Sequence, residues 1–287
     1  MPHLIAAGWL ALAASGAFVQ TGTVHDPELA EISGIAASRA RPGLLWAHND
    51  SGNAPAIFAL DRTGQVQQRV AVRGARNVDW EDIAWFEEDG QPYLAIADIG
   101  DNLQWRSHLT LYIVPEPLPG AVAVKPVRRI EFQFEDGARD VEALAVDVRG
   151  GRFLMFEKQR PPGLYELPLH PADEGIQIAR RIAVLPARWT PAPPTIESYG
   201  AIKFRNAPTA MDISRDGRRL LLLTYSHLLL FRRAGDEDWA HAIARAPLVM
   251  QRVPRIPGFE AGCFDADERS AWITREGLPA ELFWFRQ

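Results

Sequence analysis

The chain has 287 residues, of which 47% are hydrophobic and 23% are charged, a composition typical of a folded soluble protein and unlike that of a disordered chain. Its formal net charge of −5 is opposite to the basic character of most nucleic-acid binders, so we expect no nucleic-acid partner. A single cysteine, Cys263, excludes an intrachain disulfide and a cysteine-based zinc site.

The chain begins with an uncharged apolar run from Leu4 to Phe18. This run has the length of a signal-peptide core and is shorter than the roughly 20 residues that span a membrane. Ser15-Gly16-Ala17 supplies the small residues that suit signal peptidase. We therefore predict a signal peptide over residues 1–17, a mature domain over 18–287 without a membrane span, and a secreted or periplasmic location. The alternative is an apolar first strand or a misplaced start codon.

Five short segments in the rest of the chain share one pattern. Each segment contains an acidic or small polar residue, then a small or acidic residue and then, in most segments, an apolar residue. The segments are EISGIA (31–36), WEDIAW (80–85), VEALAV (141–146), PTAMDI (208–213) and FEAGCF (259–264), and their aligned positions are Ser33, Glu81, Glu142, Thr209 and Glu260.

Further apolar runs follow each segment and are typical of short β-strands. The second strands are expected at 44–50, 93–102, 152–158, 220–226 and 270–277, and the third at 56–61, 109–114, 163–168, 227–233 and 280–286. Fourth strands are expected at 66–72, 127–134, 176–184 and, with a weaker pattern, 240–250.

This repetition predicts an all-β, five-bladed β-propeller. The fifth unit lacks a fourth strand, and residues 18–24 can supply it and close the ring, which removes exposed sheet edges. A six-bladed ring is the alternative if residues 186–207, which we interpret as a proline-rich insertion, contain a degenerate blade.

Several strings carry a family resemblance. They are EISGIAAS, LLWAHNDSGN, NVDWEDIA, ADIGDN, YIVPEP and MDISRDGRRLLLLTY. Together they resemble a mostly uncharacterised family of secreted bacterial propeller proteins, from about residue 28 to the C-terminus. The architecture is also distantly similar to that of calcium-activated nucleotidases (apyrases), five-bladed propellers with one Ca²⁺ in the central tunnel. That resemblance implies a metal site at the five aligned positions.

The chemistry of the aligned residues agrees with such a site. The first strand of each propeller blade lines the central tunnel, so three carboxylates and two hydroxyls should converge there. An all-oxygen set suits a hard cation, and Ca²⁺ more than Mg²⁺. Without a cation, the carboxylates would repel one another and take up protons. In the alternative interpretation these residues are structural and bond backbone amides of neighbouring blades.

More polar residues are expected at the tunnel mouth, where the second strands end. Asp50, Asp98 and Glu157 are candidate catalytic bases. His48 is a weaker candidate base that could instead hydrogen-bond within its loop, and Asp98 to Asn102 could form either a calcium loop or an Asx turn. Lys158 and Arg275 could bind an anion. The predicted ligand-binding residues are His48, Asn49, Asp101, Asn102, Lys158, Arg275 and Glu276.

These residues leave three functions open. The first is a Ca²⁺-dependent hydrolase of phosphate esters or anhydrides. The second is a non-catalytic binding or scaffold propeller with structural calcium, whose partner is a small polar ligand or another protein. The third is a glycoside-active enzyme with a carboxylate pair. We predict a monomer in each case.

Overall fold

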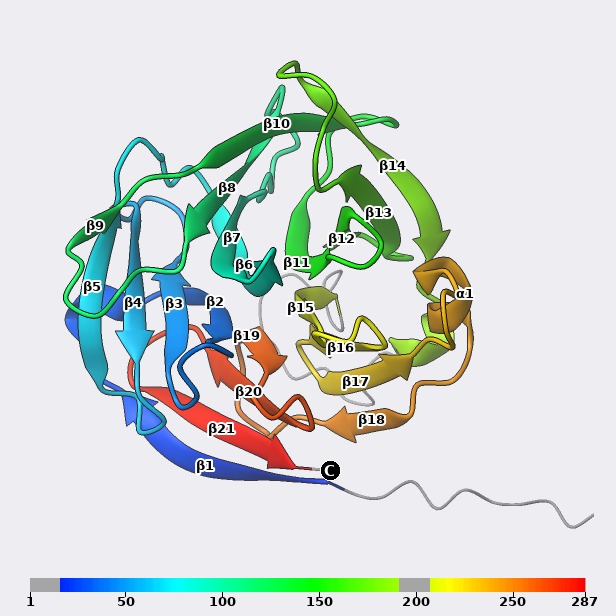
Figure 1. Ribbon diagram of the computed structural model, residues 1–287. Coiled ribbons are helices and arrows are strands. Elements are labelled where there is room, and N and C mark those ends of the chain that lie inside the picture. Colours follow the sequence, from blue (N-terminus) through cyan, green and yellow to red (C-terminus); the bar gives the residue numbers. More distant parts are fainter. Residues whose placement is uncertain (1–15, 191–206, 287) are drawn as a thin grey trace, which may run out of the picture.

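The computed structural model describes residues 16–190 and 207–286. Its β-sheets are arranged around a central axis, as in a β-propeller (Figure 1). The predicted all-β propeller class is therefore confirmed. Residues 1–15 of the predicted signal peptide and most of the predicted insertion at 186–207 lie outside the described residues. Among those described, no helix has the length and apolarity needed to cross a membrane.

The strands form four hydrogen-bonded sheets in which mostly sequential strands pair antiparallel. The first sheet contains β2 (Ile32–Ala37), β3 (Leu45–Asn49), β4 (Ala56–Leu60), β5 (Val66–Val72) and the short β9 (Ala123–Val124). The second contains β6 (Trp80–Glu88), β7 (Gln91–Asp98), β8 (Leu109–Pro115) and β10 (Arg128–Phe134). It continues, through parallel pairing of β10 with β14, to β14 (Gln177–Val184), β13 (Gly163–Pro168), β12 (Arg152–Glu157) and β11 (Val141–Asp147).

The remaining two sheets have four strands each. One contains β15 (Pro208–Ile213), β16 (Arg219–Thr224), β17 (His227–Arg232) and β18 (Val249–Arg252). The other contains β19 (Phe259–Phe264), β20 (Ser270–Arg275), β21 (Ala280–Arg286) and β1 (Ala17–Val24). The first and last strands of the chain thus lie side by side, with β1 antiparallel to β21 (Figure 1).

Three short helices complete the described structure: η1 (Pro27–Leu29), η2 (Ala187–Trp189) and α1 (Trp239–Ala244). The position of α1 corrects the strand expected over 240–250. The Asp238 carboxylate accepts from the Ala240 N–H and caps the helix, whereas Trp239 is fully buried and anchors it. The strand in this region begins only at Val249.

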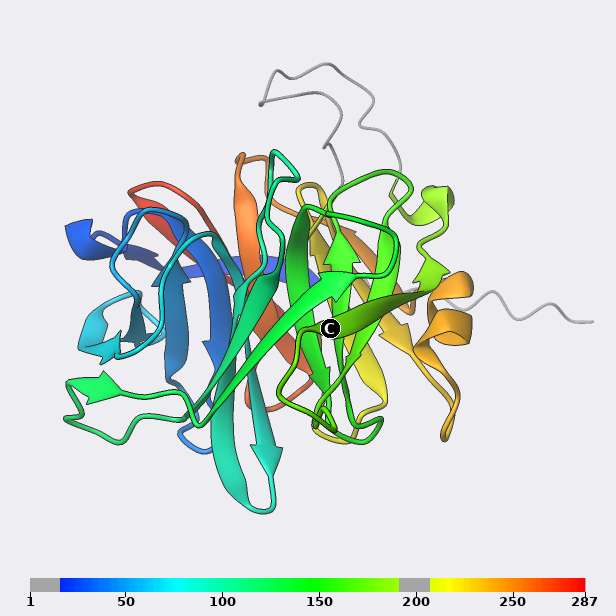
Figure 2. The same ribbon diagram turned by 90° about the horizontal axis from the view of Figure 1, so that it is seen from above.

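The hydrophobic core lies between neighbouring sheets. One cluster joins Phe156 of β12 to Leu222 of β16, Phe231 of β17 and Trp239 of α1. Because both faces of these strands are covered, their sequences are continuous apolar runs. Figure 2, viewed from above, shows the strands running through the thickness of the ring and the loops at its two faces.

Two buried aspartates hold the innermost strands together. β2, β6, β11, β15 and β19 pack against one another in this order, and β19 packs against β2. The Asp82 carboxylate on β6 accepts from the N–H groups of Leu144 on β11 (2.8 Å) and Met211 on β15 (3.1 Å). Asp212 on β15 accepts in the same way from Phe264 on β19 (3.0 Å). These bonds fix the relative heights of strands that share no ladder.

Candidate metal centre

Each innermost strand contains one β-bulge at the same place. The register with the second strand shifts between Ile32 and Gly34, and at the equivalent points of the four other strands. A bulge leaves one residue unpaired and redirects its side chain. The five bulged residues are the five aligned residues of the sequence: Ser33, Glu81, Glu142, Thr209 and Glu260.

Two of the bulged residues meet directly. The Ser33 hydroxyl on β2 lies 3.0 Å from the Glu81 carbonyl oxygen and 3.2 Å from Oε2 of the Glu81 carboxylate. Both residues are buried. The contact therefore fixes the Glu81 side chain from the neighbouring sheet.

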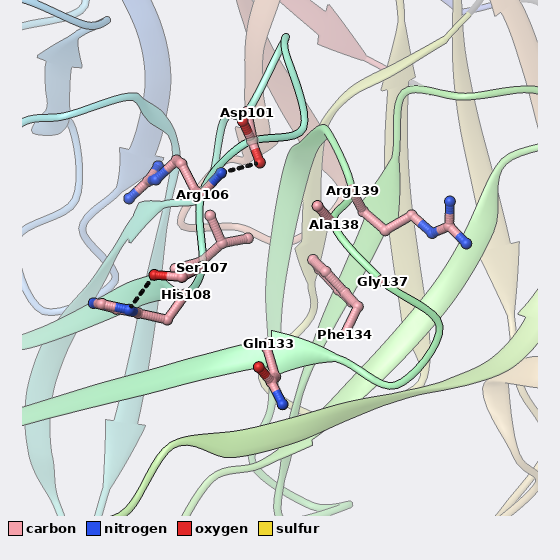
Figure 3. A pocket seen from close by; sticks show the side chains of 10 residues that line it. Asp101, Arg106, Ser107, His108, Gln133, Phe134, Gly137, Ala138 and Arg139 are labelled. Atoms are coloured by element: carbon pink, nitrogen blue, oxygen red, sulfur yellow. Dashed lines mark hydrogen bonds between the residues drawn. The ribbon is translucent and has the colours of Figure 1, made fainter.

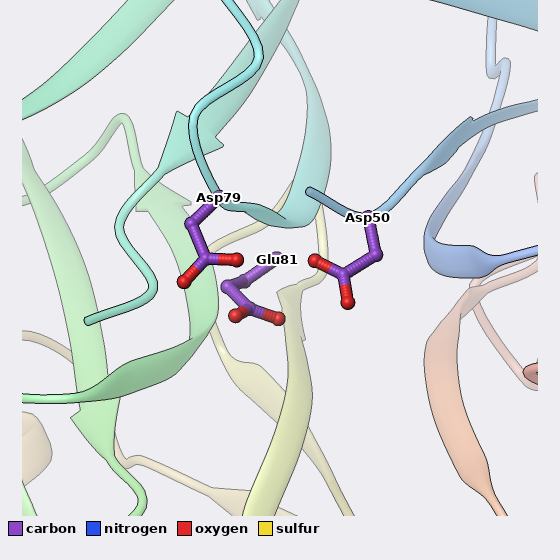
Figure 4. A group of neighbouring side chains, drawn as sticks. All are labelled: Asp50, Asp79 and Glu81. Atoms are coloured by element: carbon purple, nitrogen blue, oxygen red, sulfur yellow. The ribbon is translucent and has the colours of Figure 1, made fainter. Parts of the chain in front are cut away.

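Glu81 belongs to two groups of three carboxylates. The Asp50 triad consists of Asp50, Asp79 and Glu81, and one carboxylate oxygen from each lies within 4.8 Å of the other two. Figure 4 shows the three carboxylates turned toward one another, Asp50 from the loop after β3 and Asp79 from the chain before β6. In the Glu142 triad, Glu81, Asp140 and Glu142 approach one another within the same distance.

The backbone around the Asp50 triad leaves room for these carboxylates. A Cβ added to Gly100 would lie 2.2 Å from Oε1 of Glu81 and 2.4 Å from Oδ2 of Asp79, which is closer than atoms can approach. The Asp98 carboxylate accepts from the Asp79 N–H at 3.1 Å and so holds the loop that carries Asp79. The loops after β7 and before β6 therefore lie together against the carboxylates of Asp79 and Glu81.

Burial and mutual repulsion raise the pKa values of these groups. Burial raises the pKa of Asp79 to about 7, and the Asp50 carboxylate adds to the shift. Burial, together with the charges of Glu142 and Asp50, raises the pKa of Glu81 well above its usual range. Burial also raises the pKa of Glu142, although Lys158 opposes it. The cluster at neutral pH therefore needs protons or a cation to offset its negative charge.

The remaining bulged residues are Thr209 and Glu260. Thr209 is buried, and its Oγ1 makes no hydrogen bond within the described part of the chain. The Glu260 carboxylate accepts from the Tyr225 hydroxyl at 3.3 Å. Burial and the Glu142 charge raise the pKa of Glu260 well above its usual range. Glu260 therefore lies within electrostatic reach of Glu142, and Thr209 adds a buried hydroxyl at the equivalent bulge of β15.

The residues present fit a hard cation. Oδ2 of the buried Asp140 and Oγ1 of Thr209 lack hydrogen-bond partners among the described residues, and such buried polar atoms ordinarily have one. Carboxylate and hydroxyl oxygens are the ligands that Ca²⁺ prefers. The observed donors therefore suit calcium better than a softer transition metal.

Of the candidate bases, only Asp50 lies in a triad. Asp98 accepts from the loop before β6 and forms an ion pair of 2.8 Å with Arg106. Glu157 accepts from the Gly163 N–H at 2.9 Å. The structure therefore gives both of these carboxylates loop-holding contacts and leaves Asp50 as the base candidate nearest to the cluster.

His48 is enclosed in the core. Its ring is fully buried and meets the Trp80 ring edge-on, with centroids 5.5 Å apart. Its Nδ1 lies 3.0 Å from the Asn49 carbonyl oxygen. Burial lowers the pKa of His48, so the ring is neutral at pH 7. These contacts favour the predicted alternative of a histidine that hydrogen-bonds locally.

Two other predicted ligand-binding residues, Asn49 and Asp101, hold loops through hydrogen bonds. Asn49 accepts from the Glu31 N–H at 3.0 Å. Asp101 accepts from the N–H groups of Trp105 and Arg106, four and five residues further along, and so closes the loop between β7 and β8 on itself. Asn102 is exposed.

The predicted anion-binding cations already have acceptors within the chain. The Lys158 ammonium donates to Oε1 of Glu142. The Arg275 guanidinium donates to Glu281 at 2.6 Å and to the backbone oxygens of Glu276 and Pro279. Burial and the charge of Asp50 raise the pKa of Glu276. The mouth is therefore mainly acidic.

A separate cavity of about 240 Å³ lies between the loop before β8 and the turn after β10 (Figure 3). Its two arginines are tied to the chain: Arg106 donates to the Gly100 carbonyl at 2.8 Å, and Arg139 forms an ion pair of 3.1 Å with Asp136. These contacts support the loops on either side of the cavity.

Asp50, Asp79 and Asp140 belong to the triads but not to our predicted metal set. Asp50 was predicted as a catalytic base, whereas Asp79 and Asp140 share a position in the sequence pattern. Both precede a bulged glutamate by two residues, in the strings DWE and DVE. Alternate residues of an extended chain point to the same side. The repeated D-x-E spacing is therefore the signal in the sequence that could have identified them.

Two solved structures are similar to this chain at low sequence identity. No family model matches the chain, and no curated protein matches it. A gluconolactonase from Xanthomonas campestris is 14% identical, with 91% of this chain and 74% of that one covered, at a TM-score of 0.46. The Swd1 β-propeller domain from Myceliophteria thermophila is also 14% identical. The match covers 90% of this chain and 65% of that one, at a TM-score of 0.42.

Proposed function

We propose that the chain is a secreted, monomeric β-propeller of five blades, closed by β1, that binds one Ca²⁺ at the Asp50 triad and acts as a hydrolase on a small polar substrate. The observation that carries the proposal is the approach of three carboxylates within 4.8 Å, together with the Oδ2 of Asp140 in the adjoining triad, which has no hydrogen-bond partner among the described residues. Such a cluster is unfavourable without a counter-charge.

Asp50, Asp79 and Glu81 would provide the first ligands. Ca²⁺ takes about six to eight oxygens, so Ser33, Glu142, Thr209, Glu260 and water are the further donors that we consider. The larger and more flexible coordination of Ca²⁺ suits ligands that come from several sheets better than the small octahedron of Mg²⁺ does.

A bound calcium ion would polarise a substrate oxygen and favour ionisation of a water molecule. The chain's own residues would prepare the site. Ser33 orients Glu81, and Asp98 orients the loop of Asp79. Asp50 and Asp79 are partly exposed whereas Glu81 is buried, so a substrate would reach the ion from the side of Asp50 and Asp79.

The acidic mouth favours an uncharged substrate over a polyanion. Lys158 and Arg275 donate to Glu142 and Glu281, so a phosphate ester or anhydride would depend on the bound cation for its binding. We therefore place uncharged esters and lactones before phosphates as substrates.

Calcium titration calorimetry, combined with hydrolysis assays, tests the proposal. The assays use esters, a sugar lactone, nucleotides and sugar phosphates, each with and without a chelator. We expect Ca²⁺ binding and chelator-sensitive turnover that Glu81→Gln abolishes and that Glu174→Gln, at an exposed position, preserves. Binding without any turnover would favour the scaffold with structural calcium. A wild-type chain that binds no Ca²⁺ would overturn the proposal.

A further inference from the structure

The chain places a cation of its own inside the Glu142 triad. The Lys158 ammonium is bonded to Oε1 of Glu142, and the Lys158 backbone N–H donates to the Asp140 carbonyl at 2.9 Å. The two side chains are largely buried, with 12% of the Lys158 side chain and 5% of the Glu142 side chain exposed. One lysine thus offsets part of the charge of this triad.

The two triads cannot be filled independently because they share Glu81. A divalent cation at the Asp50 triad would draw on the Glu81 carboxylate, which already lies in the field of the Lys158 ammonium. Two cations beside one carboxylate repel each other, most strongly where water is scarce. The lysine ammonium and the metal ion would therefore compete for the carboxylate oxygens of the same cluster.

We propose that Lys158 is a tethered competitor of the divalent cation: its ammonium occupies the Glu142 triad, weakens calcium binding at the Asp50 triad and prevents a second ion from binding. This inference rests on the proposed function, because it concerns the same cluster. Lysine suits this role because its ammonium is a compact charge on a flexible stem.

Replacing the ammonium by an apolar group of similar length tests the competition. We expect Lys158→Met to bind Ca²⁺ at least about tenfold more tightly than the wild type in titration calorimetry, since one positive charge leaves the cluster. Lys158→Arg keeps the charge and should retain the wild-type affinity. Lys125→Met, at an exposed position next to β9, is the matched control and should change nothing.

The outcomes separate this inference from the proposed function. If the wild type binds Ca²⁺ and Lys158→Met binds it equally or more weakly, the competition is wrong and the metal site stands. If only Lys158→Met binds Ca²⁺, the competition is upheld and the proposed function of the wild-type site fails. If neither binds, both fail.

A measurement on the wild-type chain covers the case in which Lys158→Met does not fold. The rate at which an amine-specific reagent labels Lys158 is followed by mass spectrometry, with the exposed Lys125 as internal reference. Entry of Ca²⁺ should release the ammonium from Glu142 and raise the rate at Lys158 severalfold, with no change at Lys125. An equal or lower rate at Lys158 in Ca²⁺ contradicts the proposal.

Discussion

Glu81 and Asp82 are neighbours on β6, yet the structure surrounds their carboxylates in opposite ways. Asp82 accepts three hydrogen bonds from backbone N–H groups of three different strands. Glu81 accepts from the Ser33 hydroxyl and otherwise faces the carboxylates of Asp79 and Glu142. Both side chains are buried. The Asp82 carboxylate is thus held by backbone donors of the fold, whereas the Glu81 carboxylate has one hydroxyl donor and is surrounded by other carboxylates.

The bulge explains how adjacent residues reach such different places. In a regular strand both Glu81 and Asp82 would be paired in the ladder with β7 and held at fixed places on it. The bulge at Glu81 leaves it unpaired and redirects it toward the axis, while Asp82 resumes the ladder with Ala97. A buried carboxylate with saturated hydrogen bonds indicates structure, and one directed at other carboxylates indicates a ligand.

The largest loss of stability should come from replacing Asp82, whose carboxylate accepts three backbone hydrogen bonds. Asp82→Ala leaves the N–H groups of Ile83, Leu144 and Met211 without their acceptor, so we expect it to lower the free energy of unfolding by about 3–5 kcal/mol. Asp82→Asn keeps one acceptor and should cost less. Urea denaturation measures both variants, and a loss below about 1 kcal/mol for Asp82→Ala would contradict this structural role.

Glu116 extends the comparison to a satisfied carboxylate far from the axis. It accepts from Trp46 (3.0 Å), Trp85 (2.8 Å) and Arg41 (3.0 Å). Burial would raise the pKa of Glu116, but these hydrogen bonds outweigh burial and hold the pKa below its ordinary value. We expect Glu116→Gln to lower the free energy of unfolding by about 2 kcal/mol at pH 7.

The pH dependence of this effect has a definite sign. A lowered folded pKa contributes stability above the unfolded value of 4.5, and this contribution is lost as the pH falls through the folded pKa. The difference between wild type and Glu116→Gln should therefore shrink when denaturation is repeated near pH 3. A difference that stays constant would show that the Glu116 charge does not contribute.

Glu81→Gln tests the carboxylate that faces other carboxylates. Without calcium it should change the free energy of unfolding by less than about 1 kcal/mol, because it removes a repelled charge. The wild type should gain about 2.7 kcal/mol in Ca²⁺ at 100 times its dissociation constant, and Glu81→Gln should lose most of that gain. Melting curves in calcium and in chelator measure both, and an equal calcium gain in the two proteins would contradict a ligand role for Glu81.

Gly100→Ala should have the smallest effect on calcium binding. The new Cβ would displace the Glu81 and Asp79 oxygens, so we expect calcium binding to weaken about tenfold, equivalent to about 1.4 kcal/mol. Gly175→Ala, whose Cβ would meet only an Asp173 oxygen at 3.2 Å, is the control. Unchanged calorimetric affinity in Gly100→Ala would place the ion elsewhere.

The sequence predicted the repeating strands well because their apolar runs and spacing repeat. The prediction from sequence was wrong where tertiary contacts determine the local structure. The cap of Asp238 and the burial of Trp239 start a helix where a strand was expected. The two-residue strand β9 has no pattern of its own, because its pairing with β5 depends on a long connection folding back.

The candidate site was predictable in type more than in detail. The five aligned positions stood out, but their bulges could not be read from residue types. The pairing of Lys158 with Glu142 follows from the register of β11 and β12, in which Val141 lies opposite Glu157. The bulge at Glu142 sets that register, and residue types do not reveal it, so the sequence predicted Lys158 only as an anion-binding group at the tunnel mouth.

The central claim is that the redirected carboxylates bind one divalent ion. Equilibrium dialysis against Ca²⁺ followed by elemental analysis, on the wild type and on the double variant Asp79→Asn/Glu81→Gln, tests it most directly. The account predicts one calcium per wild-type chain and none in the double variant. No calcium in the wild type, or the same calcium content in both proteins, would contradict it.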